Sequence, residues 1–172
     1  LDRKGYRIFV QTYSPITSPG TRWSPKENMG ENISIFRHRW FGKNLFHKLE
    51  KLPALDFFYL SPYLFFRVLL FMISQNKNID VIHAQGLNAG LIGLLLKKLF
   101  RKKLIISLHA IYELEMGFLT KKAIYWILKG SNTVLGMSQA VLKQFSNLGI
   151  DPPILQEYRY WINTDKFQPS ST

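Results

Sequence analysis

Cysteine is absent from the 172-residue sequence. Its absence excludes a disulfide scaffold, a thiolate zinc site and a cysteine nucleophile, and it favours a reducing, cytosolic setting. Acidic residues are also scarce, since 11 Asp and Glu stand against 23 Lys and Arg and give a net charge of +12. This excess of positive charge favours an anionic partner, such as nucleic acid, a lipid surface or a phosphorylated substrate.

Several short motifs with known chemistry are missing as well. The four histidines lack the H-x-x-x-H spacing of a metal site, so we expect no metal. We expect no cofactor either. No G-x-S-x-G elbow and no phosphate-binding loop is present. Gly86, Gly90 and Gly93 do not form a G-x-G-x-x-G fingerprint, and they predict instead the close approach of a helix to a sheet.

No segment of the sequence has the pattern of a secretory signal or of an uninterrupted membrane span. The chain does not open on a charged segment followed by an apolar one. The longest apolar stretch, residues 57–73, is interrupted by Ser61, Pro62 and Arg67, whereas a spanning helix needs about 20 mostly uncharged residues. We interpret this stretch as a buried helix.

Residues 40–52 favour a basic amphipathic helix. One reading places this helix on an anionic bilayer, with an indole at the level of the headgroups and lysines toward the lipid phosphates. The other reading packs its apolar stripe on the protein's own core. The residues of the membrane reading are Trp40, Lys43, Lys48 and Lys51.

Strands and helices alternate from residue 62 onward, after two strands that are separated by a loop at 14–30. An alternating order predicts an α/β fold, a Rossmann-like parallel sheet with helices on both faces, as a single domain over residues 1–172. Ligands of such sheets bind beyond the carboxyl ends of the strands. Strands are predicted at 7–12, 33–37, 81–84, 104–108, 133–137 and 154–160, and helices at 62–74, 87–100, 121–129 and 139–148.

Two histidines fall at the carboxyl ends of predicted strands. His83 ends the strand at 81–84 and His109 follows the strand at 104–108, so both are candidates for a ligand site, although a structural role remains open. Glu113 lies close to His109 and is able to orient an imidazole or to accept from a hydroxyl. Ser138 precedes an apolar-periodic stretch and is predicted to cap a helix.

Four ordered segments resemble a known family. They are DVIHAQGLNAGLIGLLLKK (80–98), LIISLHAIYELE (104–115), NTVLGMSQAVLKQFSNLGI (132–150) and INTDKFQP (162–169). In this order they resemble the N-terminal domain of the glycogen-synthase-like, retaining glycosyltransferases of the GT-B fold, often called family 4. The resemblance implies that this chain is the acceptor-side half of the fold and that residues 160–172 begin the connection to a second domain.

The resemblance also implies that two parts of the fold lie outside these residues. The family opens with a strand and a glycine-rich loop, and its second domain holds the nucleotide-sugar. We therefore expect the 172 residues alone to be inactive. Where many relatives read P-N-G-V-D, this chain has different residues at 159–163, so its hinge geometry is expected to differ.

The activity implied by the resemblance is transfer of a sugar from a nucleotide-sugar to a hydroxyl acceptor, with retention and without an essential metal. His109 matches the histidine that faces the reacting sugar and is the candidate catalytic residue. The acceptor is expected to be a sugar or a lipid-linked glycan. The expected location is cytoplasmic, and the membrane reading of residues 40–52 places the protein peripherally at the inner face of the membrane. The residues expected to line the acceptor side are His83, Asn88, Glu113 and Ser138.

Two other classes of function stay open from the sequence. The positive charge and the aromatic residues, 13 Phe, 8 Tyr and 4 Trp, are compatible with a nucleic-acid-binding module, although no RNA-binding motif is visible. The chain is also compatible with a catalytically silent fragment that only binds a membrane or a partner.

Overall fold

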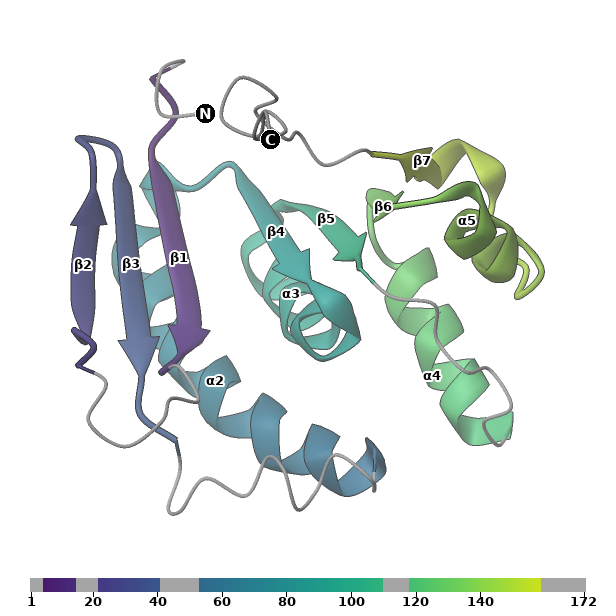
Figure 1. The fold of residues 1–172 in the computed structure, drawn as a ribbon, viewed down its shortest axis with the longest axis horizontal. Coiled ribbons are helices and arrows are strands. Elements are labelled where there is room, and N and C mark those ends of the chain that lie inside the picture. The colour runs from purple at the N-terminus through teal and green to yellow at the C-terminus, as the bar shows by residue number, and fades with distance from the viewer. Residues whose placement is uncertain (1–4, 15–21, 41–52, 110–117, 159–172) are drawn as a thin grey trace, which may run out of the picture. The chain divides into compact units, whose positions relative to one another are not determined.

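The computed structural model describes residues 5–14, 22–40, 53–109 and 118–158 (Figure 1). The chain divides into two compact units, Leu1–Ile79 and Asp80–Thr172, which are described one at a time. The single domain over residues 1–172 stays a prediction.

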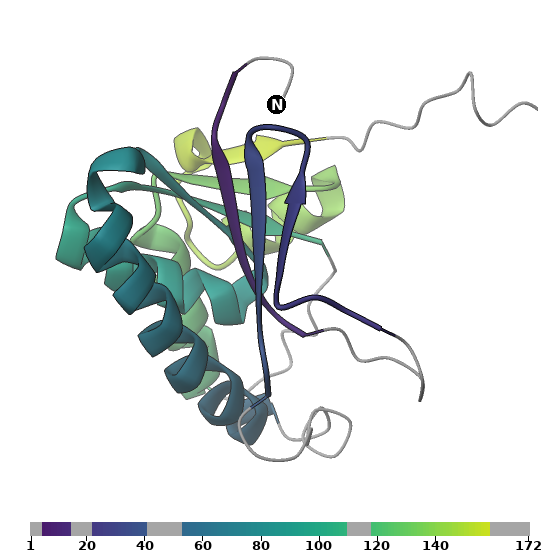
Figure 2. The same cartoon turned by 90° about the vertical axis from the view of Figure 1, so that its left-hand side faces the viewer.

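A three-stranded sheet forms the centre of the first unit (Figure 2). Its strands are β1 (Ile8–Tyr13), β2 (Lys26–Met29) and β3 (Ile33–His38), in the order β1-β3-β2. β1 runs parallel to β3, and β2 runs antiparallel to it. β2 turns into β3 through Gly30, whose φ of 68° lies in the left-handed region that glycine adopts without a steric penalty.

β2 falls inside the segment that the sequence predicts as a loop, so that prediction is wrong for these four residues. All four are exposed and three are polar, which hides the alternation by which a strand is recognised. Contacts across to β3 hold the strand in place. Arg37 forms an ion pair with Glu27 at 2.6 Å, and the Ser34 hydroxyl donates to Asn28 Oδ1 at 3.0 Å.

The long helix α2 (Pro53–Gln75) packs on this sheet and continues into the short 3-10 helix η2 (Asn76–Asn78). The Phe71 ring contacts the rings of Phe9 and Phe36, both at 5.3 Å between centroids. The Tyr13 hydroxyl donates to the Leu60 carbonyl at 2.5 Å, and burial raises the pKa of Tyr13 to about 12.

The helix predicted for this stretch is present, but it begins nine residues earlier, at Pro53 rather than Pro62. Its predicted burial is wrong for one face, where Phe58, Phe66 and Leu70 are 70%, 59% and 62% exposed. α2 is also the one described helix that is long and apolar enough to cross a membrane by length and composition.

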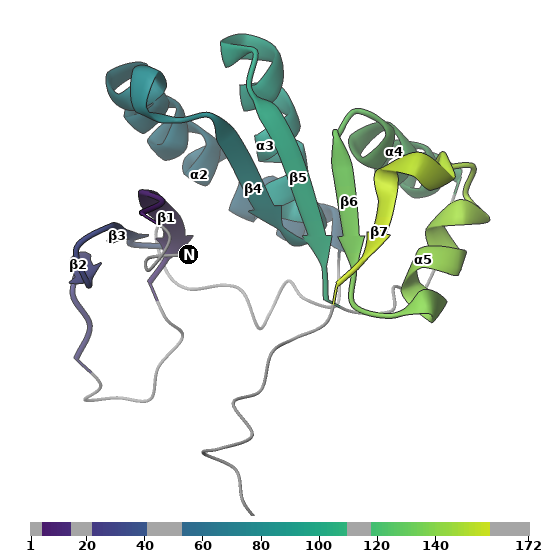
Figure 3. The same ribbon diagram turned by 90° about the horizontal axis from the view of Figure 1, so that it is seen from above.

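A four-stranded parallel sheet with the strand order β4-β5-β6-β7 forms the second unit (Figure 3). Each strand lies beside the one before it, so every crossover moves in the same direction. Right-handed crossovers of that kind place all the connecting helices on one face. Along the chain the elements are β4 (Val81–Gln85), α3 (Gly86–Phe100), β5 (Lys103–Leu108), α4 (Phe118–Lys129), β6 (Thr133–Gly136), α5 (Gln139–Ser146), η3 (Pro152–Ile154) and β7 (Leu155–Glu157).

The core of this unit lies between the sheet and its helices. Leu104, Ile106 and Leu108 alternate along β5 and are fully buried, and Leu94 and Phe145 pack into the same cluster from α3 and α5. This arrangement confirms the predicted α/β fold with a parallel sheet. The sequence predicts helices on both faces of the sheet. Among the described residues of this unit, α3, α4 and α5 cover the core face, and no described helix of the unit covers the other face.

The predicted role of the glycines in α3 is confirmed at two positions. A Cβ atom at Gly93 would lie 2.6 Å from Leu104 Cδ1, and one at Gly90 would lie 3.2 Å from Ile127 Cγ2. Since real Cβ atoms do not approach other atoms to 2.6 Å, α3 can pack this closely on β5 only without a side chain at Gly93.

Candidate functional site

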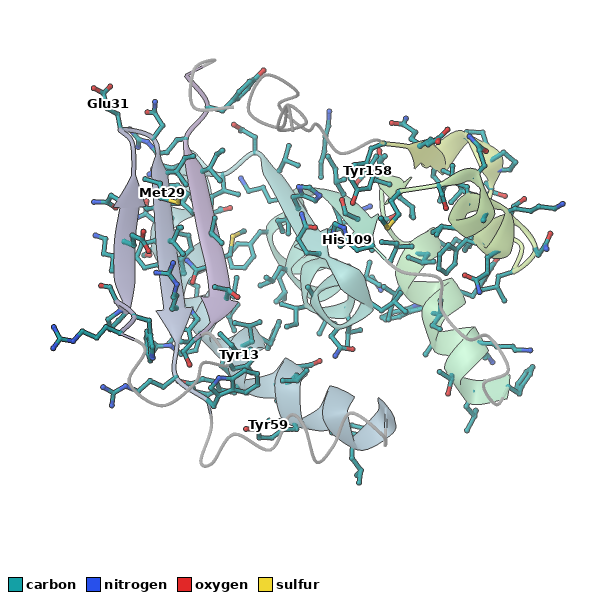
Figure 4. The ribbon with its side chains drawn as sticks, in the orientation of Figure 1. Tyr13, Met29, Glu31, Tyr59, His109 and Tyr158 are labelled. Carbon is teal, nitrogen blue, oxygen red and sulfur yellow. The ribbon has the colours of Figure 1, made fainter. Side chains whose placement is uncertain are left out.

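A group of polar side chains lies on the face of the β4–β7 sheet opposite to the core, near the carboxyl ends of the strands. Alternation along β4 places His83 and Gln85 on this face, and the register places Gln85 opposite Ser107 of β5. His109 follows β5 and Tyr158 follows β7. Both residues are labelled in Figure 4.

His83 is held by its neighbours on β4 and β5. Its Nε2 atom lies 2.6 Å from the Ser107 hydroxyl and 3.3 Å from the Gln85 amide nitrogen. Burial lowers the pKa of His83 below its ordinary value, and the neighbouring His109 lowers that pKa further. His83 is exposed as a whole residue, but its Nε2 edge is enclosed by these polar groups, and the neutral imidazole is favoured there.

His109 joins the same group from the end of β5. Its Nε2 atom is hydrogen-bonded to the side-chain oxygen of Gln85, and its Nδ1 atom lies 2.6 Å from the Tyr158 hydroxyl. The rings of His109 and Tyr158 are perpendicular, with centroids 6.0 Å apart. Gln85 therefore connects the two histidines that the sequence singles out, and the structure places both at this edge of the sheet.

Two helix N-termini of the second unit carry the other described candidates. Ser138 is the N-cap of α5, and its hydroxyl accepts from the Val141 backbone N–H at 3.3 Å, which confirms the predicted cap. Gly149, after the end of this helix, has a φ of +84°, in the left-handed region. Asn88 lies in the first turn of α3 and is half-buried. Helix N-termini present free N–H groups to anions.

Some candidates lie outside the described residues. They are Glu113 and the three lysines of the amphipathic segment, Lys43, Lys48 and Lys51. Trp40 is described, and it belongs to an aromatic cluster of the first unit. Its indole N–H donates to the Ser14 carbonyl at 3.0 Å, and its ring stacks on Tyr13 at 4.6 Å between centroids. The Trp40 ring therefore packs within the first unit.

Three residues of the polar group are not predicted from the sequence, namely Gln85, Ser107 and Tyr158. The positions of two of them could have been inferred from the alternation of side chains along a strand. Gln85 is two residues from His83, and Ser107 is two residues from His109, so the members of each pair point to the same face of the sheet. No comparable signal existed for Tyr158, since it is 49 residues from His109.

A buried histidine, His38, lies in the first unit. His38 Nε2 is 2.8 Å from Gln11 Oε1, and the Arg67 guanidinium donates to His38 Nδ1 at 3.2 Å. Burial lowers the pKa of His38, and the positive charge of Arg67 lowers it further. This histidine fastens α2 to the sheet. Within the described ranges no group of three His, Asp or Glu side chains is able to hold a metal ion.

Comparison with known proteins supports one family. Residues 1–155 match the family model described as Glycosyltransferase Family 4. A comparison with curated proteins finds no match.

Solved structures of Alr3699/HepE from Anabaena are similar to this chain in fold. The structure in complex with UDP has a TM-score of 0.58 at 16% identity, over 92% of this chain and 45% of that one. The structure in complex with UDP-glucose has a TM-score of 0.57 at 14% identity, over 79% and 33%. The chain thus spans a third to just under half of the length of these proteins. The likeness extends the α/β assignment to a Rossmann-like, GT-B fold.

Proposed function

Because the chain belongs to glycosyltransferase family 4, we propose that it is the acceptor-side part of an enzyme that transfers a sugar from a nucleotide-sugar to a hydroxyl group with retention. The observation that carries this proposal is the hydrogen-bonded group of His83, Gln85 and His109 at the carboxyl ends of parallel strands. Ligands of open parallel sheets bind at that edge.

His109 is the proposed catalytic residue. A positioned imidazole N–H can donate to a sugar hydroxyl or a phosphate oxygen and stabilise the charge that develops during transfer. Ser107 and Gln85 hold His83 beside it, so the donors and acceptors at this edge are oriented before a substrate binds. Orientation of this kind lowers the barrier without a rearrangement at the moment of reaction.

Asn88 and Ser138 are proposed to contact the acceptor. Each lies at a helix N-terminus, where free N–H groups and the helix dipole favour hydroxyl or phosphate oxygens. Glu113 remains a further candidate on this side. These roles support recognition of a polyhydroxylated or phosphorylated acceptor, and no step in them requires a metal.

The test is a transfer assay on the full-length protein. UDP-glucose is the first donor to offer, because it is present in one of the similar structures, and other nucleotide-sugars follow. We expect His109→Ala to lower kcat about 10²-fold or more, the scale of losing one positioned electrostatic group. His38→Gln, which changes a histidine of the first unit, is the matched control.

Two results would contradict this proposal. Near wild-type kcat in His109→Ala removes His109 from the mechanism. No turnover of any nucleotide-sugar by the full-length protein would favour the silent-fragment reading instead. Residues 1–172 on their own are expected to be inactive, and transfer by them would show that the donor site does not need a second domain.

We further propose that the acceptor is lipid-linked and that the first unit docks on an anionic membrane, at the inner face of a cytoplasmic membrane. The support is one face of α2 on which large apolar side chains are exposed. They recur at helical spacing and are Leu55, Phe58, Phe66, Leu70 and Ile73. Soluble monomers rarely expose so continuous an apolar stripe. The net charge of +12 complements anionic lipid.

α2 is proposed to lie on the membrane rather than to cross it. Arg67, in the middle of the helix, donates to His38 of the same unit. Met72 is buried and Phe71 packs on β1 and β3. A helix with one face on its own sheet has only the opposite face for acyl chains, as interfacial helices do.

Vesicle co-sedimentation of the full-length protein tests this docking. Binding should require anionic lipid, weaken with salt, and fall in the variant Phe66→Gln, Leu70→Gln. The pair Phe118→Gln, Leu119→Gln is the matched control, because these side chains are 77% and 80% exposed on another element. Equal binding to neutral and anionic vesicles, or by the Phe66 and Leu70 variant and the parent, would contradict it.

A further inference from the structure

Tyr158 reaches His109 from a strand that is not adjacent to it. β6 lies between β5 and β7, so the two strands are about 9–10 Å apart. The Tyr158 backbone N–H donates to the Gly136 carbonyl at 3.0 Å, which fixes the residue at the end of the sheet. From there its hydroxyl comes within 2.6 Å of His109 Nδ1 (Figure 4).

With the Gln85 amide oriented as in the structure, the atoms in this group assign the proton of a neutral His109 to one nitrogen. The side-chain oxygen of Gln85 can only accept, so His109 Nε2, which faces it, is the protonated nitrogen. A neutral imidazole has one donor and one acceptor, and Nδ1 must then accept from the Tyr158 O–H.

The same logic continues to His83. The amide nitrogen of Gln85 can only donate, so His83 Nε2 is an acceptor; its single lone pair accepts mainly from the Ser107 hydroxyl at 2.6 Å and more weakly from the Gln85 amide at 3.3 Å. Every bond from Tyr158 to Ser107 then has one donor and one acceptor. Turning the Gln85 amide by 180° would reverse the bonds and move the proton of His109 to Nδ1, so the two arrangements can be told apart by experiment.

We propose that Tyr158 is a positioning residue that holds His109 with Nδ1 as the acceptor, so that Nε2–H is the donor presented to a ligand at the sheet edge. This inference rests on the proposed function, in which His109 faces the sugar. When a substrate binds, its hydroxyl or phosphate oxygen takes the place of the Gln85 oxygen at Nε2–H. Tyr158 itself touches no substrate in this scheme.

The test reads the tautomer directly, by nitrogen NMR of the full-length protein with ¹⁵N-labelled histidine. The wild type should show His109 protonated at Nε2 and His83 protonated at Nδ1. In Tyr158→Phe the His109 Nδ1 resonance should move toward that of an unbonded nitrogen. Tyr125→Phe is the matched control, because it also removes a half-buried phenol that is hydrogen-bonded within the second unit, there to Lys129 at 2.7 Å.

Kinetics of the same variants separate positioning from binding. Tyr158→Phe should lower kcat roughly tenfold, about 1.4 kcal/mol, with KM little changed, while Tyr125→Phe keeps both. A wild-type His109 protonated at Nδ1, or a His109 spectrum unchanged in Tyr158→Phe, would overturn the inference. The wild-type spectrum is informative even if the variant does not fold.

Failure of the proposed function gives a different pattern. Full activity of His109→Ala would remove the catalytic role of His109, whereas the tautomer and its dependence on Tyr158 would still be read from the spectra. If His109 is protonated at Nδ1 and His109→Ala is inactive, the catalytic role of His109 stands. Only the positioning role of Tyr158 is then removed.

Discussion

At the scale of single residues, the second unit holds the imidazoles of His83 and His109 in one hydrogen-bonded group. Within this group a positive charge on His83 is disfavoured. Gln85 bonds to both rings, and Ser107 to His83 alone. Proton transfer and hydrogen bonding to a sugar need groups whose protonation state is defined at neutral pH. The low pKa of His83 supplies one such group.

The contribution of His109 to that pKa can be measured. Burial is the main cause of the low pKa of His83 and His109 the second, so His109→Ala should raise the pKa of His83 without restoring its ordinary value. NMR titration checks this, and His38 serves as the internal reference because its pKa depends on burial and Arg67. An unchanged pKa of His83 would show that burial acts alone.

The sequence predicted the strand-end histidines but not what connects them. His83 and His109 were found because residues at the carboxyl ends of parallel strands meet at one edge. Gln85 has no chemistry of its own that would single it out. Tyr158 could not have been paired with His109, because the two residues are 49 positions apart and follow β7 and β5, which are not adjacent in the sheet.

At the scale of elements, α3 lies close against β5 at Gly93. Gly93→Ala would place a methyl group 2.6 Å from Leu104 Cδ1, and we expect it to lower the free energy of unfolding by about 1–3 kcal/mol, the usual cost of overpacking. Denaturant titration measures this loss.

Two further variants locate the cause of that loss. Gly90→Ala should cost less, since its nearest contact is 3.2 Å. Leu104→Ala should be less harmful in the Gly93→Ala background than in the wild type, because the added methyl fills part of the space that Leu104 leaves. Additive effects of Gly93→Ala and Leu104→Ala would argue against direct steric contact.

The cap of α5 allows structure and binding to be separated at Ser138. Ser138→Ala removes the acceptor for the Val141 N–H and should lower the free energy of unfolding by about 1 kcal/mol. Ser138→Asp keeps a capping oxygen and should retain stability. If Ser138 also binds the acceptor, Ser138→Asp should raise KM while thermal unfolding is unchanged. An unchanged KM would limit Ser138 to its role as a cap.

Elements with a regular apolar pattern were predicted well, and those held by polar contacts were not. Every predicted strand and helix from residue 81 onward is found, with bounds that shift by a few residues. β2 was missed because its stability comes from pairing with β3 and from the Arg37–Glu27 ion pair. α2 extends on both sides of Pro62, although proline usually ends a helix.

At the scale of the whole molecule, each unit contains one histidine that resists protonation. The pKa of His38 and the pKa of His83 are both lowered in the folded protein, so the unfolded state binds protons first as the pH falls. Stability is therefore complete above the ordinary histidine pKa near 6.5 and is lost as the pH falls below it toward the folded values.

Thermal unfolding between pH 7.5 and pH 5.5 measures this loss. The melting temperature should fall over this range, and His38→Gln with His83→Gln should flatten the fall. Carboxylates titrate mainly below this window, so they do not mask the effect. An equal decline in the double variant and the wild type would assign the acid sensitivity to other groups.

The strand order of the second unit has one more consequence, which concerns how the protein behaves at high concentration. β4 is the outermost strand of its sheet in the described part of the chain, and its first residue, Val81, is 44% exposed. An open strand edge invites pairing with another molecule, and natural proteins often block it with lysine. We expect light scattering of residues 1–172 to show concentration-dependent self-association that Val81→Lys reduces, whereas the same substitution at Leu99, exposed at the end of α3, leaves it unchanged.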